Sequence, residues 1–136
     1  TTLWTILAIV IFLLLLAAFL AFPAYSARNM EFEVTDQGLR IRGAIYGRFV
    51  PKDELIKENI KSLNLDAETE YQPKRITNGI GLPGYSVGWF KLKNGRKALL
   101  FVTDRSRVVY IPSREGYSIL LSISQPQEFI ASTESW

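Results

Sequence analysis

Apolar residues crowd the start of the 136-residue chain, and charged residues are confined to the part that follows. Nineteen of the first 22 residues are apolar, and all 29 charged residues lie at or after Arg28. Within residues 3–22 only Thr5 is polar. Twenty helical residues span ~30 Å, about the thickness of the hydrocarbon layer of a bilayer. The pattern predicts a membrane-spanning helix followed by a charged domain at residues 28–136.

Three residues bear on where that helix ends. Pro23 lacks a backbone donor and disfavours helical geometry in the residue before it, so the helix is expected to stop there. Trp4 and Tyr25 lie near the two ends, where aromatic side chains anchor spanning helices at the membrane surface. Residues 1–27 are therefore expected to form a transmembrane anchor and a short linker.

A cleaved signal peptide is the alternative interpretation, because residues 24–26 (AYS) have the small-x-small form of a cleavage site. Two observations favour a retained single-pass anchor. The apolar run exceeds the ~7–15 residues usual in a signal peptide, and no Lys or Arg precedes it. Arg28, Arg40 and Arg42 follow the segment, so the positive-inside rule favours a domain on the cytoplasmic side.

Period-two alternation indicates short strands in the first part of the domain. Residues 30–35 (MEFEVT) alternate Glu with Phe and Val. After a turn at residues 36–38, Leu39 and Ile41 fall on one side of a second strand. Glycines on either side of the next stretch indicate a bent or bulged strand at residues 44–50.

The middle of the domain has a weaker pattern. Residues 51–55 suit a turn or a single helical turn, and residues 56–65 fit either a short helix or a strand. We favour a strand at residues 60–65. Residues 66–77 are polar and are expected to form a loop. Residues 79–84 spell GxGxxG, but no helix follows, so we expect a glycine loop that enters the next strand and no nucleotide site.

The clearest hairpin joins residues 85–93 to residues 96–103 through an Asn-Gly pair at 94–95, which is typical of a two-residue turn. Such a turn places Phe90 opposite Leu99 and makes both faces of the hairpin apolar at its centre. One face can fill a core. The other is either covered by a C-terminal helix or exposed as an interaction surface.

Two further apolar strands and a helix complete the pattern. The strands are expected at residues 108–111 and 117–124. Pro126 and Glu128 suit the first turn of a helix, because proline needs no donor there and an acidic side chain favours the helix dipole. Phe129 is expected on the buried side of this helix.

The late part of the chain carries a family resemblance. Residues 84–113 (GYSVGWFKLKNGRKALLFVTDRSRVVYIPS), the strand after them and residues 126–132 (PQEFIAS) resemble a bacterial pleckstrin-homology-type (PH) domain, a small domain often attached to a membrane segment. The resemblance implies a mainly β fold, a bent barrel-like sandwich of about seven strands with a C-terminal helix, at the bacterial inner membrane. It implies architecture more than activity.

Composition removes several kinds of chemistry. The chain has no Cys and no His, which excludes disulfides, thiolate or imidazole zinc sites and Ser-His or Cys-His nucleophiles. The acidic pairs Asp53/Glu54 and Glu68/Glu70 lie in polar segments where solvated surface charge is the default. We therefore expect no enzyme activity, no catalytic residue, no cofactor and no metal.

A basic cluster at the tip of the hairpin is the candidate binding site. Lys91, Lys93, Arg96 and Lys97 surround the Asn-Gly turn, and Trp89 lies close by. An exposed basic tip can contact anionic lipid headgroups or a protein partner, and a solvated turn that protects the end of the hairpin is the alternative.

Other anionic ligands are less well supported. The resemblance implies that phosphoinositide binding, as in eukaryotic PH domains, would use basic residues around the first strand pair. Here the turn at residues 36–38 has only Arg40 and Arg42 beyond it. A net charge of +3 and a membrane anchor also argue against nucleic acid.

These observations predict a single-pass membrane protein whose PH-like domain is a non-catalytic binding or assembly module. Protein–protein contact is the first hypothesis, either in a homo-oligomer or with another membrane protein. Recognition of anionic lipid by the basic hairpin is the alternative. Anchoring raises the effective concentration of any membrane-resident partner, so weak contacts suffice.

Overall fold

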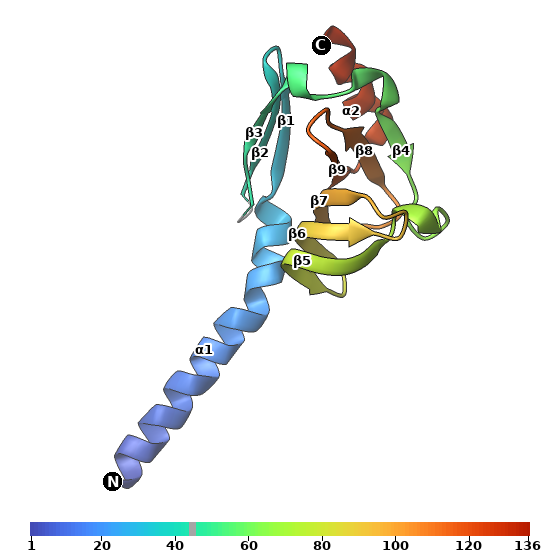
Figure 1. Ribbon diagram of the computed structural model, residues 1–136. Helices are drawn as coiled ribbons and strands as arrows, with labels where there is room; N and C mark the ends of the chain where they lie inside the picture. The colour runs from blue at the N-terminus through green and yellow to red at the C-terminus, as the bar shows by residue number, and fades with distance from the viewer. Residues whose placement is uncertain (44–45) are drawn as a thin grey trace.

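The computed structural model describes residues 1–43 and 46–136, without the side chains of residues 23–29. A long helix, α1 (Thr2–Asn29), projects from one end of a β-rich domain, and the C-terminus lies at the far end of that domain (Figure 1). The stretch Thr2–Phe22 has a mean hydropathy of 3.1, and its side chains are exposed. It is long and apolar enough to cross a membrane, as predicted.

The sequence predicts that the helix ends at Pro23. This prediction is wrong. α1 continues to Asn29, so the predicted linker is helical. A proline removes one backbone donor and crowds the preceding turn, but each later residue still adds its own hydrogen bond. A helix already long enough to cross a bilayer therefore continues through a single proline.

The first three strands form a small antiparallel sheet directly after α1. They are β1 (Glu31–Thr35), β2 (Gly38–Arg42) and β3 (Phe49–Pro51), in that spatial order. The predicted turn is confirmed, because Thr35 pairs with Gly38. Leu39 and Ile41 are buried, as their alternation indicates. Of the strand predicted at residues 44–50, residues 44–45 lie outside the described residues, and β3 covers its end.

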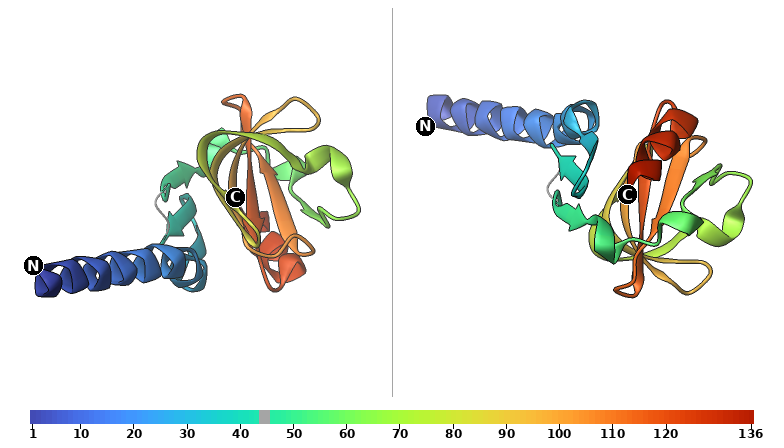
Figure 2. Two further views of the ribbon diagram at one scale, coloured as in Figure 1. Left: turned by 90° about the horizontal axis from the view of Figure 1, so that it is seen from below. Right: turned by 90° about the horizontal axis from the view of Figure 1, so that it is seen from above.

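Six strands form the second sheet, which is bent. In spatial order they are β4 (Lys61–Leu63), β8 (Val108–Pro112), β9 (Tyr117–Ser122), β7 (Lys97–Val102), β6 (Tyr85–Leu92) and β5 (Pro73–Leu82). β7 and β9 run parallel, whereas the other neighbours are antiparallel. The sheets, followed by the C-terminal helix α2 (Pro126–Ser132), give the predicted mainly β sandwich (Figure 2).

The ambiguous segment before β4 contains both kinds of structure. A 3₁₀ turn at Lys57–Asn59 precedes the strand Lys61–Leu63, so the favoured strand is confirmed in shorter form. Another 3₁₀ turn at Lys52–Glu54 confirms the helical turn predicted after β3.

β5 was missed at the sequence level, where residues 66–77 and 79–84 were expected to be loops. This ten-residue strand pairs with β6 and has irregular register near Lys74 and Thr77. Most of its side chains are exposed, so it shows no apolar alternation. Gly79 faces Gly88, and a Cβ on Gly79 would lie 2.6 Å from the Val87 carbonyl oxygen. The glycines therefore permit close strand approach, and GxGxxG is not a nucleotide loop here.

The register of the β6–β7 hairpin also differs from the prediction by one residue. Phe90 pairs with Ala98 instead of Leu99. The loop has three residues: the Gly95 N–H donates to the Leu92 carbonyl at 2.9 Å, and Gly95 has φ +86°. This geometry matches a turn followed by a left-handed glycine bulge, which is the next most common hairpin connection. An Asn-Gly pair serves both turns, so the pair alone does not fix the register.

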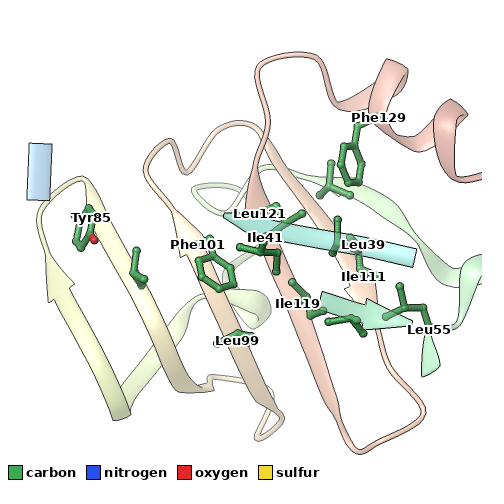
Figure 3. Close-up of a cluster of buried hydrophobic side chains, with 13 residues drawn as sticks. Leu39, Ile41, Leu55, Tyr85, Leu99, Phe101, Ile111, Ile119, Leu121 and Phe129 are labelled. Carbon is green, nitrogen blue, oxygen red and sulfur yellow. The ribbon is translucent and has the colours of Figure 1, made fainter. Parts of the chain in front are cut away.

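Both faces of the six-stranded sheet are buried along β7, β8 and β9. The first core lies between the two sheets and includes Phe101 and Ile119, with Phe129 of α2 at its edge (Figure 3). The second core lies on the opposite face and includes Leu100 and Leu120. It is closed by residues that come from β4 and the segment after it: Leu63, Leu65 and Tyr71.

The apolar second face is therefore not an exposed interaction surface. The helix expected to cover it packs against the first core instead, and the chain after β4 takes its place.

Candidate functional site

The hairpin register places the five candidate residues on two sides of the sheet. Residues at alternate positions of a strand share a face, so Trp89 and Lys91 lie on one side with Lys97, which is opposite Lys91. Lys93 lies in the loop, and Arg96 is the first residue after the loop. The basic cluster predicted from the sequence is thus divided into two smaller sites.

The first site is a row of three cations on adjacent strands. Arg75 of β5 pairs with Lys91 of β6, and Lys91 pairs with Lys97 of β7. Directly opposed like charges destabilise a sheet. Residues 71–103 hold six Lys or Arg and no Asp or Glu, so no carboxylate in these strands offsets the repulsion. We call Arg75, Lys91 and Lys97 the basic row.

Trp89 extends the basic row toward the first sheet. The Lys97 Nζ lies 4.5 Å from the centre of the indole ring, and the Arg48 guanidinium carbon lies 5.1 Å from it. The Tyr117 ring meets the indole edge-to-face, with the two ring centres 5.1 Å apart. Cation–π contacts hold both cations beside one half-buried aromatic ring. The position of Arg48 was not predicted, because it enters from the chain before β3, far away in the sequence.

The two remaining candidates, Lys93 and Arg96, lie at the tip of the hairpin and have different surroundings. The Lys93 Nζ donates to the Gln72 side-chain oxygen at 2.7 Å, and the Lys93 N–H donates to the Gln72 carbonyl at 2.9 Å. Lys93 therefore fastens the hairpin tip to this loop. Arg96 is exposed and lines a separate groove beside β4.

This groove, of about 540 Å³, lies between β4, the 3₁₀ turn before it and the hairpin tip. The Lys61 Nζ donates to the Tyr71 hydroxyl at 2.6 Å and lies 5.6 Å from the centre of the Tyr110 ring. The hydrogen bond to Tyr71, opposed by partial burial, raises the pKa of Lys61 above its ordinary value of 10.5. The Ser118 hydroxyl donates to the Tyr110 hydroxyl at 3.1 Å, which fixes the second ring. Lys61 is thus held charged and in place.

The acidic residues show no catalytic arrangement. Asp53, Glu68 and Glu70 are exposed. Asp104 accepts from the Ser106 hydroxyl at 2.6 Å and the Ser106 N–H at 2.9 Å, and these bonds stabilise the turn after β7. These two hydrogen bonds, the hydroxyl first, lower the pKa of Asp104 below its ordinary value of 3.8.

The fold and these two sites can be compared with known families. The family model described as a bacterial PH domain matches residues 30–135, which is most of the chain. The chain belongs to the bacterial PH domain family. Searches among curated proteins and solved structures returned no match.

In this PH domain the cations beyond the first strand pair already have partners. Arg42 forms an ion pair with Glu33 at 3.4 Å. The Arg40 guanidinium carbon lies 5.5 Å from the centre of the Phe49 ring. The basic row of the PH domain, by contrast, takes part in neither of the ion pairs found among the described residues. β5–β7 therefore carry three adjacent cations that no ion pair among the described residues offsets.

Proposed function

We propose that the protein is a membrane-anchored, non-catalytic PH-domain module that binds anionic lipid headgroups at the basic row. One observation carries the proposal: Arg75, Lys91 and Lys97 occupy directly paired positions on three strands with no carboxylate among them. An anion bound between three like charges on a sheet reduces their electrostatic repulsion and so stabilises the sheet.

The anchor makes weak headgroup contacts sufficient. Each Lys or Arg near an anionic surface contributes about 1 kcal/mol. α1 contacts β6 and emerges beside β5 and β6 (Figure 1). Headgroups of the bilayer that holds α1 are therefore present at high effective concentration.

Lysine footprinting on the full chain tests this proposal. The protein is placed in nanodiscs of zwitterionic lipid or of lipid containing phosphatidylglycerol, and lysine acylation is measured by mass spectrometry. We expect Lys91 and Lys97 to react more slowly in anionic discs, with the difference lost at high salt because surface charge is screened. Lys52, a half-buried lysine beside the turn at residues 36–38, is the control.

Three outcomes would contradict the proposal. Equal acylation of Lys91 and Lys97 in both lipids would do so, as would equal protection of Lys52. Protection by inorganic phosphate in zwitterionic discs, equal to that by anionic lipid, would show that the row binds free anions instead.

We also propose that the domain lies on the cytoplasmic side of the bacterial inner membrane, because Arg28, Arg40 and Arg42 follow α1. The cysteine-free chain makes the test simple. The variant Thr69→Cys should react with a membrane-impermeant maleimide only after cells are permeabilised. The variant Thr1→Cys should react in intact cells. The reverse pattern would place the domain outside.

Protein–protein assembly is the second candidate function. Among the described residues β5 pairs only with β6, so its outer edge is free, and it exposes the large apolar side chains Ile76 and Leu82. Free strand edges recruit further strands from a second copy or another protein. This supports self-association or an accessory role in a membrane complex.

The mass of the full chain in detergent tests assembly. We expect a dimer that dissociates in Leu82→Lys, because a charge on an edge strand opposes pairing, and persists in Leu82→Thr. A monomer at every concentration, or a dimer insensitive to Leu82→Lys, would contradict pairing through this edge.

A further inference from the structure

We infer that the groove beside β4 is a docking site for an acidic, extended peptide segment of a protein partner. The inference does not depend on lipid binding by the basic row, because none of the three residues of the row lines the groove.

Charge defines the first requirement for the occupant. Lys61 and Arg96 line the groove, and the guanidinium of Arg96 has no ion pair within the described part of the chain. The carboxylate that shares the groove is Glu58. The Lys61 ammonium uses one donor for the Tyr71 hydroxyl, and its remaining donors are available to a ligand carboxylate.

The walls of the groove favour a peptide over a bare phosphate. The side-chain amides of Asn59 and Asn94 can both donate to and accept from backbone groups. Ile56 and Ile60, both partly exposed, provide apolar surface for side chains between the acidic ones. A bare phosphate would use the cations and leave this surface unfilled.

The aromatic pair gives the site its rigidity. The Tyr71 and Tyr110 rings meet edge-to-face at 5.1 Å, and Lys61 lies over both. Tyr110 is buried and bonded to Ser118, which is also buried. A preorganised cation loses less freedom on binding than a mobile surface lysine, and this increases affinity.

Fluorescence anisotropy with the full chain in zwitterionic nanodiscs tests the inference. The probe is a labelled peptide of alternating Glu and Val with blocked ends, and the matched control peptide has Gln in place of Glu. We expect only the Glu peptide to bind. Lys61→Gln and Arg96→Gln should each weaken binding by roughly 3- to 10-fold, as expected for one lost charge-assisted hydrogen bond.

Two further variants separate positioning from charge. Tyr71→Phe keeps every charge but removes the acceptor that holds Lys61, so it should weaken binding by about 2- to 3-fold. Glu58→Gln removes the acid in the groove and should strengthen binding. Lys52→Gln lies elsewhere and should leave binding unchanged.

Each of the following results would overturn the inference. The Gln peptide binds as tightly as the Glu peptide; Lys61→Gln and Arg96→Gln leave binding unchanged; or excess inorganic phosphate displaces the peptide completely, which would identify a small-anion site. Loss of binding in Lys91→Gln alone would place the peptide on the basic row and would also overturn it.

Discussion

Lys91 lies directly opposite Lys97 across β6 and β7, and on its other side it faces Arg75. Its two nearest cross-strand neighbours are therefore cations. The arrangement opposes folding and favours an anionic ligand, so the same substitution should have opposite effects on stability and on binding.

Lys91→Glu should stabilise the domain and abolish headgroup protection. A carboxylate at this position faces two cations, and opposite-charge cross-strand pairs contribute roughly 0.2–1 kcal/mol each. Chemical denaturation in zwitterionic nanodiscs measures the stability, and acylation of Lys97 measures the protection. Lys52→Glu, with the same charge change elsewhere, should do neither. A destabilised Lys91→Glu would contradict the repulsion argument.

Gly88→Ala should destabilise the domain much more than Gly84→Ala. Gly88 has φ +117°, and a Cβ there would lie 2.5 Å from the Gly79 Cα. Strain and overpacking together predict a loss of roughly 2–4 kcal/mol. Gly84 has φ +71° but nothing within 4 Å, so only about 1 kcal/mol is expected. Equal losses in denaturant titrations would show that the close approach of β5 to β6 is wrong.

Phe101→Ala and Leu100→Ala should disturb different cores. Both side chains are completely buried, Phe101 in the first core and Leu100 in the second. Each truncation should cost roughly 2–5 kcal/mol. Methyl NMR should show shifts at Ile119 for Phe101→Ala and at Leu120 for Leu100→Ala. Shifts at both residues in either variant would mean that the two cores are continuous.

Ser106→Ala should raise the pKa of Asp104 toward 3.8. The Ser106 hydroxyl donates to the carboxylate, which favours its charged form, and the variant keeps the backbone donor alone. Because the pKa of Asp104 is lowered by folding, its contribution to stability is present above pH 3.8 and is lost as the pH falls through the folded pKa. A carboxyl NMR titration checks this, and an unchanged Asp104 would contradict it.

Leu13→Arg should lower the fraction of the protein that stays in the membrane, whereas Leu13→Ala should not. Leu13 lies near the middle of the apolar stretch, and its side chain is exposed. An Arg at the centre of a spanning helix costs about 2.5–3.5 kcal/mol on insertion scales. Carbonate extraction of membranes separates the two outcomes. Equal retention of Leu13→Arg and Leu13→Ala would contradict this expectation.

The elements predicted well are those in which one residue pattern has one structural meaning. Leu39 and Ile41 alternate with arginines, and only a half-buried strand suits that pattern. β5 has no such pattern because both of its sides are largely exposed, and it exists through backbone pairing with β6. Its pairing partner must be known before the strand can be recognised.

The sequence identifies the residues of the candidate site but does not predict how they are arranged. All five residues near the hairpin were identified, but the one-residue difference in loop length decides which of them share a face. Arg48, Arg75 and Lys61 join these residues only through tertiary contacts and strand pairing. No local pattern around them indicates those contacts.

The position of β7 between two cores has a consequence for how the chain can vary. Every residue from Ala98 to Val102 is buried, and successive residues alternate between the cores. From Ala98 to Val102 neither face of the strand is exposed to solvent. A single-residue insertion or deletion within it would exchange the contents of both cores at once, so variation in chain length is confined to the turns at its two ends.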